Sequence, residues 1–412
     1  MKILLVCEDI PRPQLGGLGK HVLALASELH SRGHEVDILG SAYHPIDTHP
    51  EQAGPGRFIG DISGHQRGWA QRHLGAFHPA ANALNGRALA RAIMRHAPGH
   101  DVIHYHGHLP WVAQLLPPQL PFTQSRHDQG GDCMLQTRFQ PEGLRCEQRA
   151  PEACAGCATA KPNFAQRQLS HWSVRRVREA TSRGYARYPV IFVSAFLQTA
   201  FAKVSAVGLQ GEVIHNAAEL QALRDASAAA GLRDGTAARV EVFAAGQLTS
   251  YKGFGQLLGE LHKQGLPGDW RLTIAGDGPE LGRLRKRHAS DSVRFLGWCD
   301  RASVLGHTVA ADVVVVPSVW EEPCATTVIE ALALGRTVFA LRLGGTPELA
   351  MYAGPGGDRL RLFDNMPELV RELRGFRGAA QDAAVSLAHF TGTVSAMTDA
   401  VLAHYARHFG VR

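Results

Sequence analysis

Two glutamates flank a turn that directly follows a strongly apolar run. Glu322 and Glu330 stand eight positions apart, and the four valines of Val313–Val316 lie just upstream. Thr327 and Glu330 have the spacing of a capping box, in which side chains accept hydrogen bonds from amides at a helix start, and Gly335 fits the helix end. This local role accounts for Glu330 only. It does not explain Glu322. It also leaves free backbone amides at the helix start, and such amides suit an anion.

Glycine-containing turns follow an apolar strand in each half of the chain. In the second half, the segment 245–253 brings Lys252 to a strand end, which suits a diphosphate; a solvated loop lysine is the alternative. In the first half, Gly16 and Gly17 would let backbone amides approach a phosphate or a sugar, although a plain tight turn fits the same residues. Both turns are therefore candidates for binding an anionic ligand.

Histidines gather near two expected strand ends. His104, His106 and His108 alternate in the sequence HYHGH, and His127 precedes an aspartate after the next strand. Three alternating histidines suggest a metal site, but we expect the strand to divide them between its two faces, so the polar wall of a cleft is the favoured interpretation. The chain has no Asp-x-Asp motif, which argues against a site that holds a diphosphate through a divalent ion.

Four of the seven cysteines lie within 25 residues, namely Cys133, Cys146, Cys154 and Cys157. Their spacing includes a Cys-x-x-Cys pair, which two further thiolates can complete to a tetrahedral zinc site. In a cytosolic protein such a cluster favours a metal over disulfides. The spacing of an iron–sulfur cluster is not recognisable. We expect a structural zinc, with free or redox-active thiols as the alternative.

Length and composition indicate a globular chain of more than one domain. At 412 residues the chain exceeds one typical core, and 45% apolar with 19% charged residues is a globular composition.

No apolar run is long enough to span a membrane, and the first residues resemble a strand more than a signal peptide, so we expect a cytoplasmic protein. A net charge of +6 favours phosphate-bearing ligands or an anionic membrane, and nothing indicates nucleic-acid binding.

Both halves alternate strands with helices, which predicts parallel sheets built from βαβ units. In the first half the expected strands are Lys2–Cys7, Glu35–Leu39, Asp101–His104, Leu120–Ser125 and Val190–Val193. In the second half they are Arg239–Ala245, Trp270–Ala275, Val293–Leu296, Asp312–Val316 and Thr337–Leu341. We expect an α/β fold of two Rossmann-like domains, 1–220 and 239–382, joined by a linker at 221–238, with helices of 383–412 packing back onto the first domain. Ligands should bind where the carboxyl ends of the strands face a shared cleft.

The order of these motifs resembles that of glycosyltransferase family 4 (GT4), the retaining glycosyltransferases of the GT-B fold. The Gly-Gly loop, the HxH and His-Asp pairs, the G-x-L-x-x-x-K-G and GDGP turns, and the segment Pro317–Gly335 occur in the family's order over nearly the whole chain. The resemblance implies a nucleotide-sugar donor in the carboxyl-terminal domain and an acceptor held mainly by the amino-terminal domain. It also implies retention of anomeric configuration and no cofactor for catalysis.

The resemblance assigns roles residue by residue. Glu330 resembles the glutamate that holds the ribose hydroxyls, Glu322 the one beside the donor sugar, and Lys252 the lysine that takes up the charge of the departing diphosphate. His127 resembles the histidine near the transferred sugar. The catalytic set is therefore Glu322, His127 and Lys252, and the donor-binding set is Gly16, Gly17, Gln247, Lys252, Phe295, Leu296, Gly297, Glu322, Thr326 and Glu330.

Three positions depart from the family pattern. Gln247 stands where an arginine is usual, so one partner for phosphate charge is missing. Cys324-Ala325 replaces Phe-Gly, and Ala217 after Asn216 replaces glycine. The first two departures favour the alternative of a catalytically silent nucleotide-sugar-binding scaffold subunit, and the cysteines that of a thiol-based redox sensor.

The leading hypothesis is an enzyme that moves a sugar from a nucleotide-diphosphate sugar to a hydroxyl of a glycan or lipid-linked acceptor, in the biosynthesis of cell-surface polysaccharide or glycoconjugate. Members of the resembled family often act on lipid-linked acceptors. The segment Gln168–Arg187 carries five arginines against one glutamate, which would suit peripheral contact with an anionic membrane. A solvated helix face is the alternative.

Overall fold

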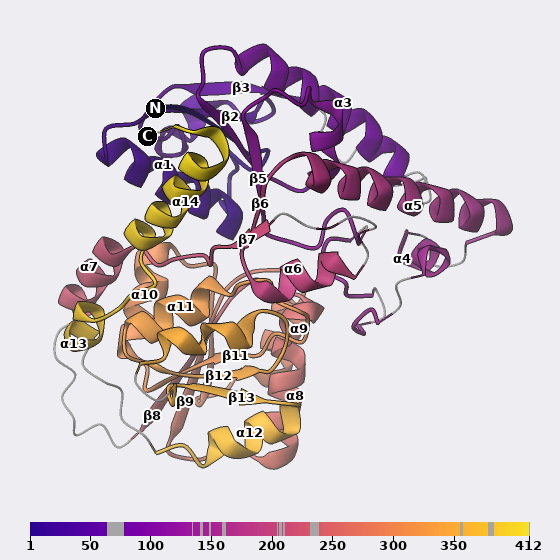
Figure 1. The fold of residues 1–412 in the computed structure, drawn as a ribbon. Coiled ribbons are helices and arrows are strands. Elements are labelled where there is room, and N and C mark those ends of the chain that lie inside the picture. Colours follow the sequence, from indigo (N-terminus) through magenta and orange to yellow (C-terminus); the bar gives the residue numbers. More distant parts are fainter. Residues whose placement is uncertain are drawn as a thin grey trace. The chain divides into compact units, whose positions relative to one another are not determined.

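The structure is a computed structural model that divides into two compact units. Unit 1 comprises Met1–His215 and Val394–Arg412, and unit 2 comprises Asn216–Thr393. The residues described are 1–63, 78–133, 135–140, 143–147, 150–158, 162–203, 205, 208, 211–230, 239–354, 357–377 and 383–411. Each unit is an open parallel sheet with helices packed against it (Figure 1), so the expected α/β fold is confirmed.

The sheet of unit 1 has the strand order β3-β2-β1-β4-β5-β6-β7, with every pair parallel. The central strands β4 and β5 are buried along their whole length because helices cover both faces, whereas the edge strands β3 and β7 are partly exposed. The strands are β1 Lys2–Val6, β2 Glu35–Ser41, β3 Phe58–Ile62, β4 Val102–His106, β5 Phe122–Arg126, β6 Val190–Phe192 and β7 Gly211–Val213.

Helix α1 shows how the spacing of apolar residues places a helix against the sheet of unit 1. In α1 (Gly17–Ser31) the apolar side chains that recur at helical spacing are buried, and Gly33 follows with φ 86°, as a helix end requires. The other helices of unit 1 are α3 His78–His96, α4 Cys154–Ala158, α5 Phe164–Arg187, α6 Ala195–Ala202 and α14 Val394–Phe409, with short 3-10 turns η1 Ile46–Thr48, η2 Pro50–Gln52, η4 Pro110–Leu115 and η5 Pro151–Ala153.

The sheet of unit 2 has the strand order β10-β9-β8-β11-β12-β13, again all parallel. Helices α8 and α12 lie on one face, and α7, α10, α11 and α13 on the other (Figure 1). The strands are β8 Val240–Ala245, β9 Trp270–Ala275, β10 Val293–Gly297, β11 Val313–Val316, β12 Thr337–Leu341 and β13 Leu360–Phe363. The helices are α7 Leu220–Ala230, α8 Phe254–Gln264, α9 Leu281–His288, α10 Arg301–Ala310, α11 Thr326–Ala333, α12 Met366–Arg374 and α13 Ala383–Ala388, with 3-10 turns η6 Ser250–Lys252 and η7 Thr346–Tyr352.

The chain passes between the units at places that differ from the expected boundaries. The first half of the expected linker, 221–230, is helical and belongs to α7, which packs on α10 and α13 within unit 2. Of the two carboxyl-terminal helices, α13 belongs to unit 2, and only α14 belongs to unit 1.

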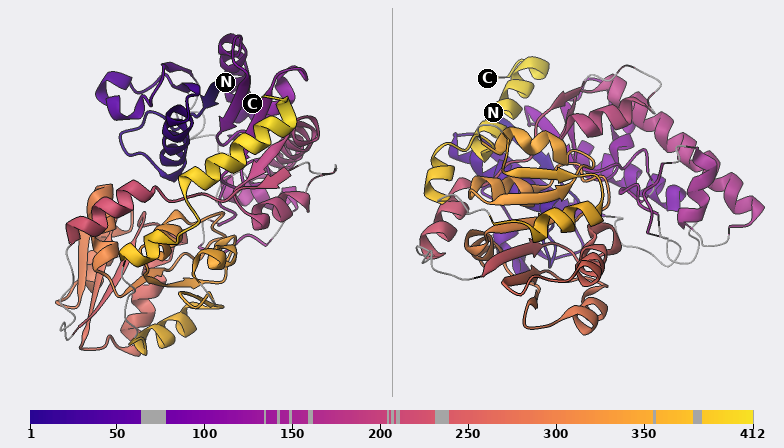
Figure 2. Two further views of the ribbon diagram at one scale, coloured as in Figure 1. Left: turned by 60° about the vertical axis from the view of Figure 1, so that its left-hand side comes forward. Right: turned by 90° about the horizontal axis from the view of Figure 1, so that it is seen from below.

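Helix α14 (yellow in Figures 1 and 2) lies beside α1. There Arg32 forms an ion pair with Asp399 and donates a hydrogen bond to the carbonyl of Ser395 over 2.9 Å. None of the helices in the described residues is long and apolar enough to cross a membrane.

Candidate functional site

An ion pair between two predicted site residues lies at the carboxyl ends of β8 and β11. Nζ of Lys252 donates to Oε1 of Glu322 over 2.5 Å, and the Ser318 hydroxyl donates to the same oxygen over 2.7 Å. The ammonium group also lies 5.3 Å from the centroid of the Trp320 ring, within the range of a cation–π contact. The sequence-predicted pair is therefore brought together, with Ser318 and Trp320 as additional partners.

Glycines let the loops that carry this pair approach each other closely. Gly253 has φ 75°, and a Cβ atom there would lie 1.9 Å from the carbonyl oxygen of Pro317. Gly344 has φ 60°, and its Cβ would lie 2.3 Å from the carbonyl oxygen of Glu322. That carbonyl accepts a hydrogen bond from the amide of Gly345 over 2.8 Å. Glu322 is thus fixed through both its backbone and its side chain.

The charge state of Glu322 follows from its surroundings. Burial by itself would raise the pKa of this carboxyl group, but the charge of Lys252 and the hydrogen bonds from Lys252 and Ser318 outweigh it and hold the pKa below the usual value. Glu322 is therefore ionised at neutral pH. A buried carboxylate neutralised by a lysine can accept hydrogen bonds from the hydroxyl groups of a ligand, and the lysine can exchange its partner for an anion.

The helix after this pair begins differently from our expectation. Ala325 is the N-cap of α11, and no side chain caps the helix. The predicted capping box is therefore wrong, because the helix starts one residue before Thr327, so that both threonines stand inside its first turn. Glu330 lies in the helix body, where its carboxylate is 3.1 Å from the guanidinium of Arg301. Thr326 is the first helical residue, and the helix N-terminus carries partial positive charge.

Gly335 terminates α11 as predicted. It has φ 73°, its amide donates to the carbonyl of Leu332, and the amide of Arg336 donates to the carbonyl of Ala331. This is the double hydrogen-bond pattern of a Schellman motif.

Other predicted donor-binding residues of unit 2 follow β8 or end β10. Gln247 follows β8 and its side-chain oxygen accepts a hydrogen bond from the Tyr251 hydroxyl over 3.1 Å. Asn216, the residue before Ala217, donates to the carbonyl of Cys324 over 3.2 Å, so the segments that carry two of the departures from the family pattern are in contact. Phe295, Leu296 and Gly297 end the edge strand β10, where the Gly297 carbonyl accepts from the amide of Gly276 over 2.7 Å.

The glycine pair of unit 1 stands at the start of α1. Gly16 is the N-cap with φ −77°, and Gly17 is the first helical residue. A Cβ atom on either residue would meet nothing within 4 Å. The tight-turn interpretation would require a left-handed φ or a close neighbour, and these two positions have neither.

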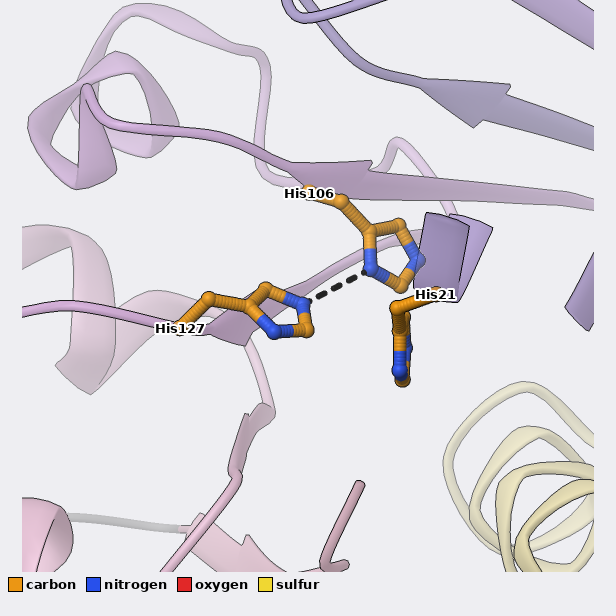
Figure 3. Close-up of side chains that lie close together, drawn as sticks. All are labelled: His21, His106 and His127. Carbon is orange, nitrogen blue, oxygen red and sulfur yellow. Dashed lines mark hydrogen bonds between the residues drawn. The ribbon is translucent and has the colours of Figure 1, made fainter. Parts of the chain in front are cut away.

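Three histidine rings converge in unit 1 (Figure 3). His106 comes from β4, His127 follows β5, and His21 comes from α1. Nδ1 of His106 and Nε2 of His127 are 3.1 Å apart, and the ring centroids of His21 and His127 are 4.6 Å apart. Burial lowers the pKa of His21 to about 4 and holds the pKa values of His106 and His127 well below the usual value. All three rings are therefore neutral at physiological pH.

The expected division of the alternating histidines between two faces is wrong. Residues two positions apart share one face of a strand, and the ring centroids of His104 and His106 are 3.9 Å apart. The two ring nitrogens of His104 form hydrogen bonds with the hydroxyl groups of Tyr405 and Ser125, over 2.6 and 2.8 Å. His108 lies beyond the end of β4.

His108 belongs to a separate network that shapes the loop after β5. One ring nitrogen pairs with Asp128, and the other lies 3.2 Å from a carboxylate oxygen of Asp9. Burial would lower the pKa of His108, but the two carboxylates outweigh it and raise the pKa well above the usual value. Asp128 also accepts hydrogen bonds from the Arg126 guanidinium over 2.9 Å and from the amide of Gly130 over 2.7 Å. These fixed charges hold the segment that follows His127.

Three of the four clustered cysteines, Cys133, Cys146 and Cys154, are close enough for their charges to interact. Burial raises the pKa of Cys133 and raises that of Cys154 to about 11, with neighbouring thiols contributing in the same direction. Among the residues that the structure describes, the groups with at least three potential metal-ligand atoms within 4.8 Å of one another are His21 with His106 and His127, and Glu212 with His404 and His408. The sulfur atoms do not form such a group.

Sequence reasoning missed several residues of this arrangement. Ser318 and Trp320 lie within the motif quoted for Glu322, but their types alone carry no recognisable spacing. Arg301 is separated from Glu330 by most of a βα unit, so the ion pair depends on the fold. His21 follows Gly17 by one helical turn, and that spacing could have indicated that both face the same ligand region.

Comparisons with known proteins identify the family of the chain. The family model described as Glycosyltransferase Family 4 matches residues 15–221, and the model described as Glycosyl transferases group 1 matches residues 239–373. Glycogen synthase of Mycobacterium tuberculosis is 26% identical over 377 residues, which cover 86% of this chain and 81% of that protein. An uncharacterised 42.6 kDa protein in the cps region of Klebsiella pneumoniae is 34% identical over 108 residues, or 26% of this chain and 27% of that protein.

Solved structures share the fold. Sucrose-phosphate synthase from Thermosynechococcus elongatus superposes with a TM-score of 0.68 at 19% identity, covering 99% of both chains. The Anabaena protein HepE in complex with UDP and glucose superposes with a TM-score of 0.63 at 18% identity, covering 98% of this chain and 99% of that one. At these identities the likeness concerns the fold of two Rossmann-like domains.

Proposed function

The chain belongs to the group 1 glycosyltransferases of family 4, and on this premise we propose that it transfers a sugar from a nucleotide-diphosphate sugar to an acceptor hydroxyl with retention of anomeric configuration. The observation that carries the proposal is the Lys252–Glu322 pair at the start of α11. It supplies a cation for a diphosphate, a carboxylate for sugar hydroxyls, and a helix N-terminus that favours an anion.

The chemistry requires negative charge to be stabilised where it develops. As the bond between the anomeric carbon and the phosphate oxygen breaks, the diphosphate gains charge, which Lys252 and the first amides of α11 are suited to stabilise. The acceptor oxygen forms its bond on the same face of the sugar, and its proton passes to the leaving phosphate oxygen. The products are a glycoside with unchanged anomeric configuration and a nucleoside diphosphate. No metal ion enters this scheme.

Glu322 and Glu330 would hold different parts of the donor. Glu322 is buried, ionised and fixed by Ser318, which suits the hydroxyls of the transferred sugar. Glu330 is less buried and paired with Arg301, which suits a ribose at the outer part of the site. Phe295–Gly297, at the end of an edge strand, would meet the base through backbone groups, and His127 would lie near the transferred sugar, as the family resemblance implies.

The open position at the start of α1 supports a ligand role for Gly16 and Gly17. Because a Cβ atom would meet no protein atom there, the local fold does not require glycine. A donor phosphate or sugar approaching the amides would require it.

For the acceptor we propose a glycan or a lipid-linked sugar. A pocket in unit 1 has an apolar wall of Leu109, Trp111, Val174 and Val177 beside the polar His108 and Asp132. A wall of this kind suits one face of a sugar ring or a lipid chain.

Helix α5 would contact an anionic membrane close to this pocket. Phe164 is 77% exposed and Trp172 55% exposed, and the guanidinium of Arg176 lies 5.8 Å from the centroid of the Trp172 ring. Aromatic and arginine side chains together are typical of membrane interfaces. The measurement is co-sedimentation with vesicles: the parent should bind anionic vesicles more than neutral ones, and Trp172→Ser should reduce that difference. Equal binding of parent and variant would remove the membrane role of α5.

The main test is donor consumption by the purified chain. Nucleoside diphosphate release should occur with at least one nucleotide sugar, and the anomeric proton of the product should show the configuration of the donor by NMR. Binding without release would favour the silent scaffold, which Gln247 in place of a cation would explain. An inverted product would reject the retaining mechanism. A redox-sensor role has less support, because the raised pKa of Cys154 keeps that thiol protonated.

A further inference from the structure

The three convergent histidines of unit 1 have a geometry that the sugar-transfer scheme does not use. One potential ligand atom from each of His21, His106 and His127 lies within 4.8 Å of the other two. The rings come from a helix, from a strand and from the residue after the next strand; those of His106 and His127 face each other, and that of His21 lies beside them (Figure 3). Three separate elements therefore fix the rings in space, as a preformed ligand set requires.

The hydrogen-bonding capacity of this group is not used up. His106 is fully buried, and its Nε2 atom has no hydrogen-bond partner in the described part of the chain. Its Nδ1 atom faces Nε2 of His127, although two neutral rings can share only one hydrogen at that contact. An ion bound through Nδ1 of His106 would leave the ring hydrogen on Nε2, the tautomer in which a neutral imidazole is a metal ligand.

We propose that His21, His106 and His127 bind a divalent transition-metal ion, with zinc as the best match. Zinc prefers nitrogen ligands in tetrahedral geometry, and three protein ligands leave its fourth position open. Zn–N bonds of about 2.0–2.1 Å put neighbouring ligand atoms roughly 3.3 Å apart in a tetrahedron. The separation of 3.1 Å between His106 and His127 is close to this value, and a ligand atom of His21 lies within 4.8 Å of both.

The ion would act as an inhibitor. This consequence rests on the proposed function, in which His127 lies near the transferred sugar. A metal that holds His127 would withdraw it from the sugar and place a positive charge where the scheme needs none. Zinc bound at this site is therefore expected to suppress transfer reversibly, and a chelator should restore it.

Cobalt provides a direct test that does not depend on activity. The full-length protein, freed of metal with a chelator, is titrated with Co²⁺ while visible absorption is recorded. We expect one equivalent with the bands of a low-coordinate nitrogen-ligated ion. Any thiolate charge-transfer band would belong to the four cysteines and should disappear in Cys154→Ser/Cys157→Ser, while the nitrogen-type bands persist. His21→Gln and His127→Asn should each weaken binding at least about tenfold, because each removes a ligand.

Matched variants identify the site. His30→Gln lies on the same helix as His21 but is exposed, and it should bind Co²⁺ like the parent. His408→Gln tests the group formed with Glu212 and His404 and should also leave the nitrogen-type bands unchanged. Circular dichroism of each variant checks that the fold is retained.

The possible results separate this inference from the proposed function. Absence of the nitrogen-type bands in the parent, or their persistence in both His21→Gln and His127→Asn, would overturn the metal site whatever the activity. Loss of the bands in those two variants supports the site even in a preparation that transfers no sugar. Zinc inhibition of the parent that is unchanged in His21→Gln would reject the inhibitory role.

Discussion

Nζ of Lys252 and Oε1 of Glu322 are 2.5 Å apart, although 70 residues separate them in the sequence. They meet because β8 and β11 are neighbours in the sheet, so that the loops after both strands emerge at the same edge. Lys252 supplies a positive charge for the diphosphate, and Glu322 supplies a carboxylate for the hydroxyl groups of the sugar. The pair also keeps the buried Glu322 carboxylate neutralised when no ligand is present.

Glu322→Gln is expected to retain the fold and lower turnover at least tenfold, equivalent to about 1.4 kcal/mol in the barrier. Glutamine can still accept hydrogen bonds from Ser318 and Lys252, but it removes the charge that orients the lysine and the sugar. Turnover at saturating donor is the measurement, with Glu321→Gln as the neighbouring control. Turnover within twofold of the parent would show that the carboxylate of Glu322 is not needed.

Lys252→Ala is expected to weaken donor affinity and slow transfer together, because it removes the cation next to the diphosphate. Gln247→Arg, five residues earlier on the same loop, should strengthen donor binding or leave it unchanged. Calorimetric titration with the donor measures both. Lys263→Ala is the control, since that lysine is exposed and paired with Glu260. Equal affinity of Lys252→Ala and the parent would contradict a phosphate role.

The strands that the sequence did not reveal are all at sheet edges. β3 and β7 flank the sheet of unit 1, and β13 flanks that of unit 2. A central strand of a parallel sheet is buried on both faces and forms an apolar run, as β11 does with four valines. An edge strand has one neighbour and need not be apolar, so Phe58–Ile62 includes a glycine and an aspartate, and Gly211–Val213 is only three residues long.

Within the site, the sequence indicated residue types better than contacts. Lys252 and Glu322 were predictable because each follows an apolar strand in a recognisable motif. The pairing of Glu330 with Arg301 was not, because a local interpretation, the capping box, used the same carboxylate. That competition was decided by where α11 begins, which depends on the packing of its apolar face rather than on Thr327.

Gly17→Ala and Gly253→Ala should have opposite effects on stability. Gly17 is helical and has open space beside it, so alanine should stabilise the fold by about 0.5–1 kcal/mol while weakening donor binding. Gly253 has φ 75° and a carbonyl 1.9 Å from the added Cβ, so alanine should destabilise unit 2 by more than about 1 kcal/mol. Thermal unfolding and donor titration measure both effects. A Gly17→Ala variant with unchanged affinity would leave that glycine without a ligand role.

His404 should make the stability of unit 1 sensitive to acid. Burial lowers its pKa to about 4 against the opposing effect of Glu212, and the ring is held by Thr123 of β5 at 2.9 Å and Glu212 of β7 at 3.1 Å. Arg407 and His408 of α14 face the same carboxylate. Between pH 6.5 and about 4 the unfolded chain binds a proton that the folded chain does not, so stability falls as pH falls through this window.

A pKa lowered from 6.5 to about 4 corresponds to roughly 3 kcal/mol as an upper bound. Denaturant unfolding between pH 7 and 4 is the measurement, and His404→Gln should lose less stability over that range than the parent. His389→Gln, which replaces a histidine of unit 2, is the control. Parallel pH profiles for the parent and His404→Gln would contradict a neutral His404 in the folded state.

The cysteine cluster is predicted to bind one zinc ion that stiffens the loop after His127. Cys133 and Cys154 are protonated in the structure because burial raises their pKa values, so zinc would have to displace protons and draw the sulfur atoms together. Ion pairs anchor this loop on two sides, because Arg138 and Arg178 both pair with Asp132, at 3.3 and 3.1 Å. Removing the metal should therefore loosen the loop without unfolding either sheet.

Elemental analysis of the purified protein, which measures its zinc content, tests this prediction. Cys154→Ser/Cys157→Ser should lose one equivalent of zinc that His21→Gln retains, because the two sites share no ligand. Acceptor binding should weaken in the cysteine variant, while donor binding, which depends on Lys252 and Glu322 in unit 2, should stay unchanged. A parent protein without zinc whose four thiols all react freely in the native state would leave the cluster without a metal role, and the raised pKa values would then describe ordinary buried thiols.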